Sequence, residues 1–171
     1  MREDAEITGD FVDRFTQEWR RSRPEIDASG AAGLLRVLRL GAHLERELAI
    51  LCAGQGLKPG QFQVLAALRR RDPQPLTATE LAEAAILTSG AMTPILDKLE
   101  AQGLIRRQAD DSDRRARRIT ITPKGRSTID RALDLRMARH RELNAVLDPE
   151  ERAALAAILR KLLLAVEKGA A

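Results

Sequence analysis

Aromatic residues and cysteine are scarce in this chain of 171 residues. It has three phenylalanines, one tryptophan, no tyrosine and a single cysteine, Cys52. One cysteine excludes an intrachain disulfide and is typical of a reducing cytoplasm. No apolar run approaches the length that spans a bilayer, and the polar, acidic start, MREDAEITGD, does not resemble a secretory signal. These absences predict a cytoplasmic protein that does not enter a membrane.

Sequence motifs of catalysis and metal binding are absent as well. The chain has no nucleophile elbow, no phosphate-binding glycine loop and no metal-binding helix motif. His43, His140 and Cys52 are far apart in the sequence, so a metal site would need carboxylates at a suitable spacing, and no such spacing occurs. The sequence therefore predicts neither an enzyme nor a bound cofactor or metal.

The residues that are abundant predict a globular chain made mainly of helices. Hydrophobic residues make up 44 % of the sequence and charged residues 32 %, which suits a folded core. A first helix, capped by Asp10, is expected to end near Arg21, and a long helix should cover residues 31–53. A last helix begins at LDPEE, and its wide apolar face, which we interpret as a dimer seam, consists of Leu155, Ile158, Leu159, Leu162, Leu163 and Val166.

The middle of the chain has the pattern of two helices joined by a tight turn. TATE is a capping box, in which the Thr77 hydroxyl and the Glu80 carboxylate each satisfy an amide at the start of the first helix. ILTSG forms the turn, and the second helix should cover residues 89–102. Gly103 is well placed as the left-handed residue after it. This spacing predicts a helix-turn-helix.

A basic hairpin follows the helix-turn-helix. LIRRQ and RRITIT are expected to be two short strands, with the polar tip ADDSDRRA between them. Three acids lie between Leu104 and Arg126, so this segment has a net charge of +5, whereas the rest of the chain sums to −1. Its eight basic residues are Arg106, Arg107, Arg114, Arg115, Arg117, Arg118, Lys124 and Arg126. A charge concentrated on one small element indicates a polyanionic partner.

These motifs together resemble the MarR family of bacterial regulators. The likeness is carried by TATELAEAAILTSGAMTPILDKLEAQGLIRR and by DDSDRRARRITITPKG, and it covers roughly residues 31–166. It implies a winged helix-turn-helix lobe at 58–125, between an extension with a first dimerisation helix at 1–57 and C-terminal dimerisation helices at 126–171. Two copies would pair at the helical base and present two lobes to double-stranded DNA.

The resemblance also implies roles for individual residues. The second helix of the helix-turn-helix would lie in the major groove, and the hairpin would enter the minor groove. With Arg115 in the minor groove, Asp113 would hold the tip in shape, and its neighbours would meet phosphates. The predicted DNA-binding residues are Thr88, Ser89, Thr93, Pro94, Lys98, Asp113, Arg114, Arg115, Arg117 and Arg118.

Members of this family usually respond to a small aromatic or phenolic anion that releases DNA. Phe15 and Trp19 lie on one face of the first helix, as does Phe11. Phe15 and Trp19 could wall a pocket for such a ligand, with Arg107 as its charge partner, or the aromatic face could simply attach the extension to the body. The extension looks like that of the urate-responsive branch, but Gln63 and Ile95 replace its acid and arginine, which argues against urate.

Two alternatives remain open at this stage. Cys52 could make the protein a thiol-based redox sensor, although a cysteine among apolar neighbours is more often buried filler. The winged helix could also serve protein interaction without binding DNA. The arginine-rich hairpin favours DNA, because a wing that docks a protein does not need such a charge.

Overall fold

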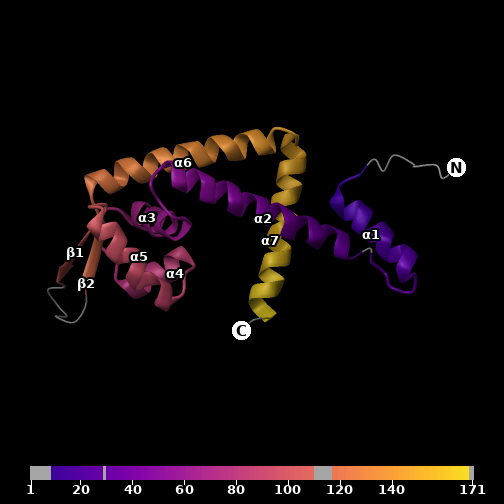
Figure 1. Ribbon diagram of the computed structural model, residues 1–171, viewed down its shortest axis with the longest axis horizontal. Coiled ribbons are helices and arrows are strands. Elements are labelled where there is room, and N and C mark those ends of the chain that lie inside the picture. Colours follow the sequence, from indigo (N-terminus) through magenta and orange to yellow (C-terminus); the bar gives the residue numbers. More distant parts are fainter. Residues whose placement is uncertain (1–8, 29, 110–116, 170–171) are drawn as a thin grey trace. The chain divides into compact units, whose positions relative to one another are not determined.

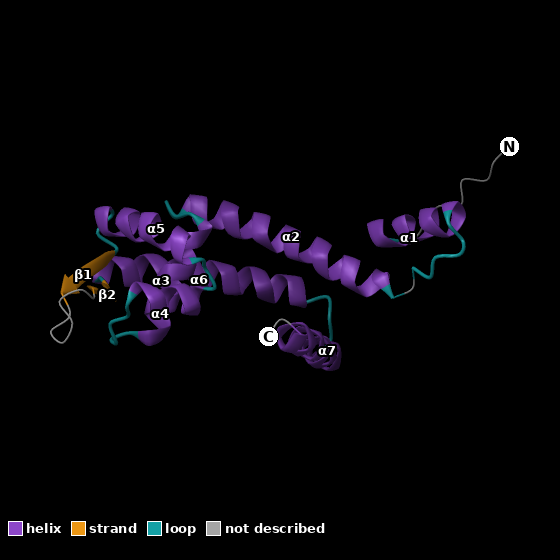
Figure 2. Cartoon of the chain, turned by 90° about the horizontal axis from the view of Figure 1, so that it is seen from below, coloured by secondary structure: helices purple, strands orange, loops and turns teal. Residues whose placement is uncertain are grey.

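Most of the described part of the chain is helical, and the two strands found in that part form one antiparallel hairpin (Figures 1 and 2). The computed structural model describes residues 9–28, 30–109 and 117–169, and it falls into two compact units, residues 1–50 and 51–171. The predicted fold class, mainly α with a small β-hairpin, is confirmed. The elements are α1 (Phe11–Ser22), α2 (Ala31–Gly54), α3 (Pro59–Arg71), α4 (Ala78–Ala85), α5 (Ser89–Ala101), β1 (Ile105–Ala109), β2 (Arg117–Ile121), α6 (Pro123–Asn144) and α7 (Pro149–Gly169).

In the first unit, charged groups attach α1 to α2. The Asp10 carboxylate caps α1 as predicted and accepts hydrogen bonds from two amides of the first turn, at 2.7 and 3.0 Å. Arg36 of α2 binds two acids, with Nε 2.8 Å from Asp10 Oδ2 and Nη2 2.6 Å from Asp13 Oδ1. The Arg39 guanidinium lies 4.3 Å from the centre of the Phe11 ring. Part of the aromatic face of α1 therefore packs against α2.

In the second unit, α3, α4 and α5 pack around one apolar core together with the hairpin and α6. Leu81 provides the contact from α4. We call α3, α4, α5 and the hairpin the lobe. Its largest fully buried side chains include Phe62, Leu65, Leu68, Leu81, Met92, Leu99 and Ile119.

The hairpin is joined to the start of α4 as well as to itself. Strand β1 pairs with β2, with Ile105 opposite Ile121. On the other edge of β2, Leu76 and Ile119 exchange two backbone hydrogen bonds of 3.0 and 2.8 Å. Leu76 directly precedes the capping box of α4, so the base of the hairpin has a fixed position relative to that helix.

A close backbone approach joins the end of α5 to the start of α6. Gly103 has a φ of 69°, as predicted, and turns the chain from α5 into β1. Thr122 caps α6 by accepting the Gly125 amide at 3.0 Å, and its hydroxyl donates to the Gly103 carbonyl at 2.8 Å. Gly125 leaves so little room that a Cβ there would stand 2.1 Å from the Leu104 carbonyl oxygen. The first turn of α6 therefore lies directly on the backbone that leads into the hairpin.

Two ion pairs fasten α3 to α6, and we call them the α3–α6 clamp. Arg69 Nε lies 2.8 Å from Asp130 Oδ1, and Arg126 Nε lies 2.5 Å from Asp72 Oδ2. Each arginine donates through two nitrogen atoms, which fixes the orientation of its guanidinium. The hydrogen bonds from Arg126 lower the pKa of the Asp72 carboxyl. The pair therefore stabilises the fold above the ordinary aspartate pKa and loses this effect as the pH falls through the lowered one.

The helix α7 begins as predicted and buries none of its residues. Asp148 and Glu151 form its capping box, with backbone-to-carboxylate hydrogen bonds of 2.8 and 2.9 Å. None of the described helices is long and apolar enough to cross a membrane. The exposed apolar side chains of α7 are Leu155, Ile158, Leu159, Leu162, Leu163, Leu164 and Val166.

The approach at Gly125 gives a direct test of the fold. We expect Gly125→Ala to lower the free energy of unfolding by about 2–3 kcal/mol, because the added methyl group meets backbone that cannot move aside. Urea denaturation measures this change. Gly33→Ala is the matched control, since Gly33 is helical and nothing lies within 4 Å of a Cβ there. Equal stability of the two variants would contradict the close approach.

Candidate nucleic-acid interface

One side of α5 is buried in the lobe, and the other side faces solvent. Met92, Leu96 and Leu99 form the buried side. The predicted contact residues Thr93, Pro94 and Lys98 are exposed, as is Thr88 at the cap position. Ser89 is the first residue of α5, but its side chain lies outside the part of the chain that the structure describes. The exposed side thus carries hydroxyl groups, a proline ring and one ammonium group.

The start of α5 has the features of an anion site. Thr88 takes the cap position with extended backbone, but its side chain makes no capping hydrogen bond to α5. The first amides of this helix therefore keep donors for an external acceptor such as a phosphate. Pro94 lies inside the helix and has no amide hydrogen, so the carbonyl four residues earlier loses its helical donor. Both features leave backbone polar groups available at one end of α5.

The arginines of the hairpin strands fall into two groups by exposure. Arg106 of β1 and Arg117 of β2 are exposed, whereas Arg107 and Arg118 are half-buried. The three tip residues predicted to contact DNA or shape the wing, Asp113, Arg114 and Arg115, lie outside the described residues, so their roles stay predictions. Among the described strand residues, Arg106 and Arg117 have the exposure that contact with a polyanion requires.

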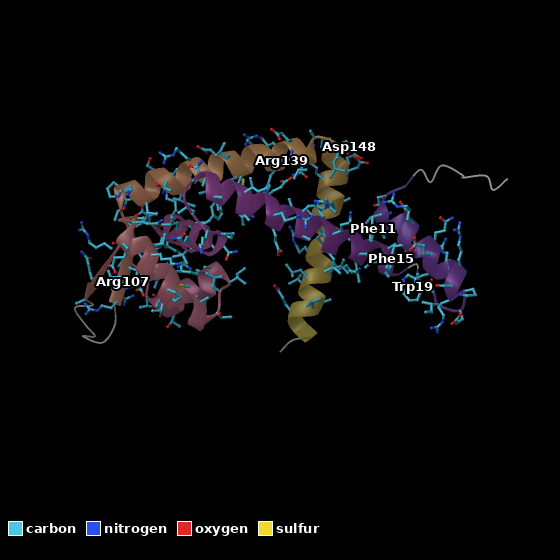
Figure 3. All side chains as sticks on the ribbon, in the orientation of Figure 1. Phe11, Phe15, Trp19, Arg107, Arg139 and Asp148 are labelled. Atoms are coloured by element: carbon cyan, nitrogen blue, oxygen red, sulfur yellow. The ribbon has the colours of Figure 1, made fainter. Side chains whose placement is uncertain are left out.

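Arg107, which is labelled in Figure 3, binds two acids of α5. Its Nη1 lies 2.7 Å from Asp97 Oδ1 and 3.2 Å from Glu100 Oε2, and its backbone amide donates to Glu100 Oε1 at 3.2 Å. The Arg107 side chain is only 25 % exposed. These contacts connect β1 to the exposed side of α5, and they neutralise carboxylates that would repel a phosphate. We call Arg107, Asp97 and Glu100 the wing brace.

A second ion pair connects β2 to the start of α4. Arg118 Nη1 lies 3.5 Å from Glu80 Oε2. The same carboxylate completes the capping box, in which it accepts the Thr77 amide at 2.7 Å. Hydrogen bonds from Thr77 lower the pKa of Glu80, and the charge of Arg118 adds to this effect. Arg118, which the sequence assigned to phosphate contact, therefore also holds the hairpin against the helix-turn-helix.

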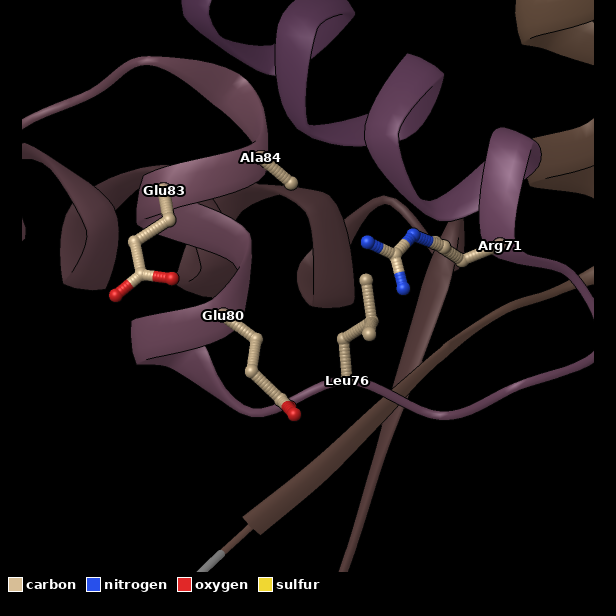
Figure 4. A pocket seen from close by; sticks show the side chains of 5 residues that line it. All are labelled: Arg71, Leu76, Glu80, Glu83 and Ala84. Atoms are coloured by element: carbon tan, nitrogen blue, oxygen red, sulfur yellow. The ribbon is translucent and has the colours of Figure 1, made fainter.

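A hollow of about 290 Å³ opens beside α4 (Figure 4). It is lined by Arg71, Leu76, Glu80, Glu83 and Ala84. Its lining contains two carboxylates and one guanidinium, so its net charge disfavours an anion. This hollow fits neither a phosphate nor the aromatic anion that the sequence predicted.

The residues predicted to bind that anion lie in both units of the chain. Phe15 and Trp19 belong to the first unit and form an edge-to-face pair on α1, with ring centres 6.2 Å apart (Figure 3). Arg107 belongs to the second unit, where the wing brace uses its charge. The shared ligand site of these three residues stays a prediction.

A second hollow, of about 400 Å³, lies between the end of α6 and the start of α7. Its lining contains more cationic groups than that of the first hollow. Arg152 donates to the Asn144 carbonyl at the end of α6, at 3.2 Å, and to the Leu147 carbonyl in the following loop, at 2.6 Å. The lining residues are Met137, His140, Arg141, Asn144 and Arg152.

Cys52 is fully buried near the end of α2. Burial raises the pKa of its thiol, although the charge of Arg136 opposes the effect. A redox-sensing cysteine needs the opposite environment, because the thiolate is the reactive form. Among the described residues, no group of three or more His, Cys, Asp or Glu is placed to hold a metal ion.

The wing brace and the Arg118–Glu80 pair were not predicted from the sequence. Asp97 and Glu100 are three residues apart on α5, a spacing that puts them on neighbouring positions of one helix face. That spacing gives no indication of the strand residue that binds them. The capping box did identify Glu80, but only for its local role.

Comparison with known proteins identifies relatives over most of the chain. A sequence model of the MarR family matches residues 55–116. The HTH-type transcriptional regulator PecS of Dickeya dadantii (strain 3937) is 28 % identical over 152 residues, which cover 88 % of this chain and 92 % of PecS. A crystal structure of a MarR-family transcriptional regulator from Silicibacter pomeroyi is 31 % identical, with a TM-score of 0.64, over 82 % of this chain and 92 % of that one.

The fold is also found in a protein that was solved with DNA. The S. aureus MepR-DNA complex superimposes with a TM-score of 0.69 over 76 % of this chain and 96 % of that chain. Its sequence identity is 23 %, so this likeness concerns the fold.

The wing brace predicts how Arg107 affects binding to duplex DNA. We expect Arg107→Met to weaken binding by about tenfold, because it uncovers two carboxylates beside α5, while stability changes by less than about 1 kcal/mol. Fluorescence anisotropy with labelled duplex and thermal denaturation measure the two effects.

The triple variant Arg107→Met/Asp97→Asn/Glu100→Gln is the matched control. It should recover most of the lost affinity, because it removes the carboxylates that Arg107 neutralises. If the triple variant binds as weakly as the single one, then Arg107 acts by another route, such as direct contact with DNA or a ligand.

Proposed function

This chain belongs to the MarR family of transcriptional regulators, and we propose that it acts as a homodimeric repressor that a small aromatic anion releases from DNA. The proposal rests most on one arrangement in the lobe. The exposed side of α5 and a basic hairpin are held together by the wing brace. A helix and a hairpin in fixed relation match a major groove and the adjacent minor groove.

In the proposed complex, α5 enters the major groove by its N-terminal end. Its uncapped amides would donate hydrogen bonds to a phosphate, and the Thr93 methyl and Pro94 ring would contact bases. The exposed side of α5 has no Arg, Asn or Gln, so we expect modest base readout and a larger contribution from groove shape. Arg115 would enter the minor groove, and Arg114 and Arg117 would contact phosphates, as would Arg118 in addition to its pair with Glu80.

The apolar face of α7 supports the homodimer. A helix of 21 residues gains its stability mostly from packing, and α7 buries none of its residues within the described structure. A contiguous exposed apolar face of this kind marks an interface. A second copy of the chain is the partner that gives two lobes and a two-fold axis. Two such lobes require a pseudo-palindromic operator with half-sites about one helical turn apart.

We further propose that a small aromatic or phenolic anion changes the spacing of the lobes and so releases the operator. Phe15, Trp19 and Arg107 are the residues that the sequence suggests for it. The hollow at the end of α6, which contains His140, Arg141 and Arg152, has the charge that an anion needs. A thiol switch at Cys52 has less support, because burial raises the pKa of that thiol.

The arginine-bearing wing predicts a strong salt dependence of DNA binding. Affinity should fall by about three orders of magnitude between low and physiological salt, because each phosphate contact releases counterions.

Arg115→Ala should weaken operator binding at least about tenfold while the protein stays folded. Gel-shift titrations at several salt concentrations measure both effects. Unchanged binding by Arg115→Ala would remove the wing from the mechanism.

The homodimer is tested separately on α7. We expect Leu162→Glu to shift the protein from dimer to monomer in analytical ultracentrifugation, because it places a charge in an apolar interface. Operator affinity should fall at least about a hundredfold, since a single lobe reads only one half-site. Lys161→Glu introduces the same side chain at a neighbouring polar position and should remain dimeric. A monomeric wild-type protein would refute this part of the proposal.

A further inference from the structure

Ile86 has the most exposed large hydrophobic side chain of the described residues, at 92 %. It lies in the turn between α4 and α5. Its backbone has φ 54° and ψ 49°, which is the left-handed region. A β-branched residue is rarely found there, because its Cβ crowds the backbone. Ile86 therefore combines an unfavourable backbone conformation with an unfavourable exposure to water.

Among the described residues, no contact offsets either cost. The Ile86 amide donates to the Glu83 carbonyl at 3.2 Å, and the Leu87 amide donates to the Ala82 carbonyl at 2.9 Å. These two bonds end α4 in the way that usually places glycine at the left-handed position. Glycine would make the same bonds without steric crowding and without exposing an apolar side chain. The fold therefore gives no reason for isoleucine, whereas residues kept in strained conformations are concentrated at functional sites.

The position of Ile86 indicates what its side chain contacts. It lies two residues before Thr88, at the end of α5 that has uncapped amides. If that end of α5 enters the major groove, the preceding turn lies at the edge of the groove. The major groove presents one apolar group, the 5-methyl of thymine. A phosphate or a charged partner would gain nothing from an isoleucine.

We propose that Ile86 is a DNA-contacting residue that packs against a thymine methyl group at the edge of the major groove. This inference rests on the proposed insertion of α5. It adds a specificity contact from the turn to the base contacts proposed for Thr93 and Pro94 on the exposed side of α5. It also explains the strained backbone, because the left-handed conformation points the side chain away from the lobe.

Two variants separate the contact from the strain. Ile86→Gly and Ile86→Asn both suit the left-handed backbone, and both remove the apolar side chain. We expect each to raise the thermal midpoint by about 2–4 °C, because the strain is relieved. We expect each to weaken binding to a selected operator about fivefold, a loss typical of one apolar contact.

Operators with uracil in place of thymine identify the partner. Replacing the contacted thymine should weaken wild-type binding about fivefold and leave Ile86→Gly unaffected, because uracil lacks only the methyl group. Thr93→Ser is the control, because it removes the other side-chain methyl group that is proposed to contact a base. Binding by this variant should still weaken when uracil replaces the thymine that Ile86 contacts.

The outcomes distinguish this inference from the function on which it rests. A wild-type protein that binds no duplex refutes the proposed function. Wild-type binding together with full affinity of both Ile86 variants overturns the inference alone. A loss of affinity that is the same on thymine and uracil operators overturns the assignment to thymine.

Discussion

The burial of Met92, Leu96 and Leu99 decides how this protein meets a partner. When one side of a helix packs into an apolar core, the opposite side is the one that faces solvent. For α5 the presented side holds Thr93, Pro94 and Lys98. The packing of the lobe core therefore determines which side chains of α5 can contact DNA.

Charge on the segment from Leu104 to Arg126 serves two purposes that its net value of +5 does not separate. Arg107 and Arg118 bind acids of α5 and α4, so they set the position of the strands relative to the helix-turn-helix. Arg106 and Arg117 are exposed and provide the positive surface. Some arginines of this segment therefore make ion pairs within the protein. For this reason the net charge of the segment overstates the number of arginines that are available to bind a polyanion.

The sequence predicted the features that depend on neighbours along the chain. The capping box at Thr77, the start of the last helix at LDPEE, the left-handed Gly103 and the strand at RRITIT are local patterns, and each was confirmed. The ion pairs between α5 and β1 and between α3 and α6 join residues that meet only after folding, and nothing in their spacing indicated them. Ile86 was missed for another reason. The pattern rules expect glycine or asparagine at a left-handed position, so an isoleucine there attracts no attention.

The α3–α6 clamp has a mechanical consequence. Arg69 and Arg126 each bind a carboxylate through two nitrogens, so α3 and the first half of α6 are joined at two points. A change in the direction of α6 would therefore also act on α3.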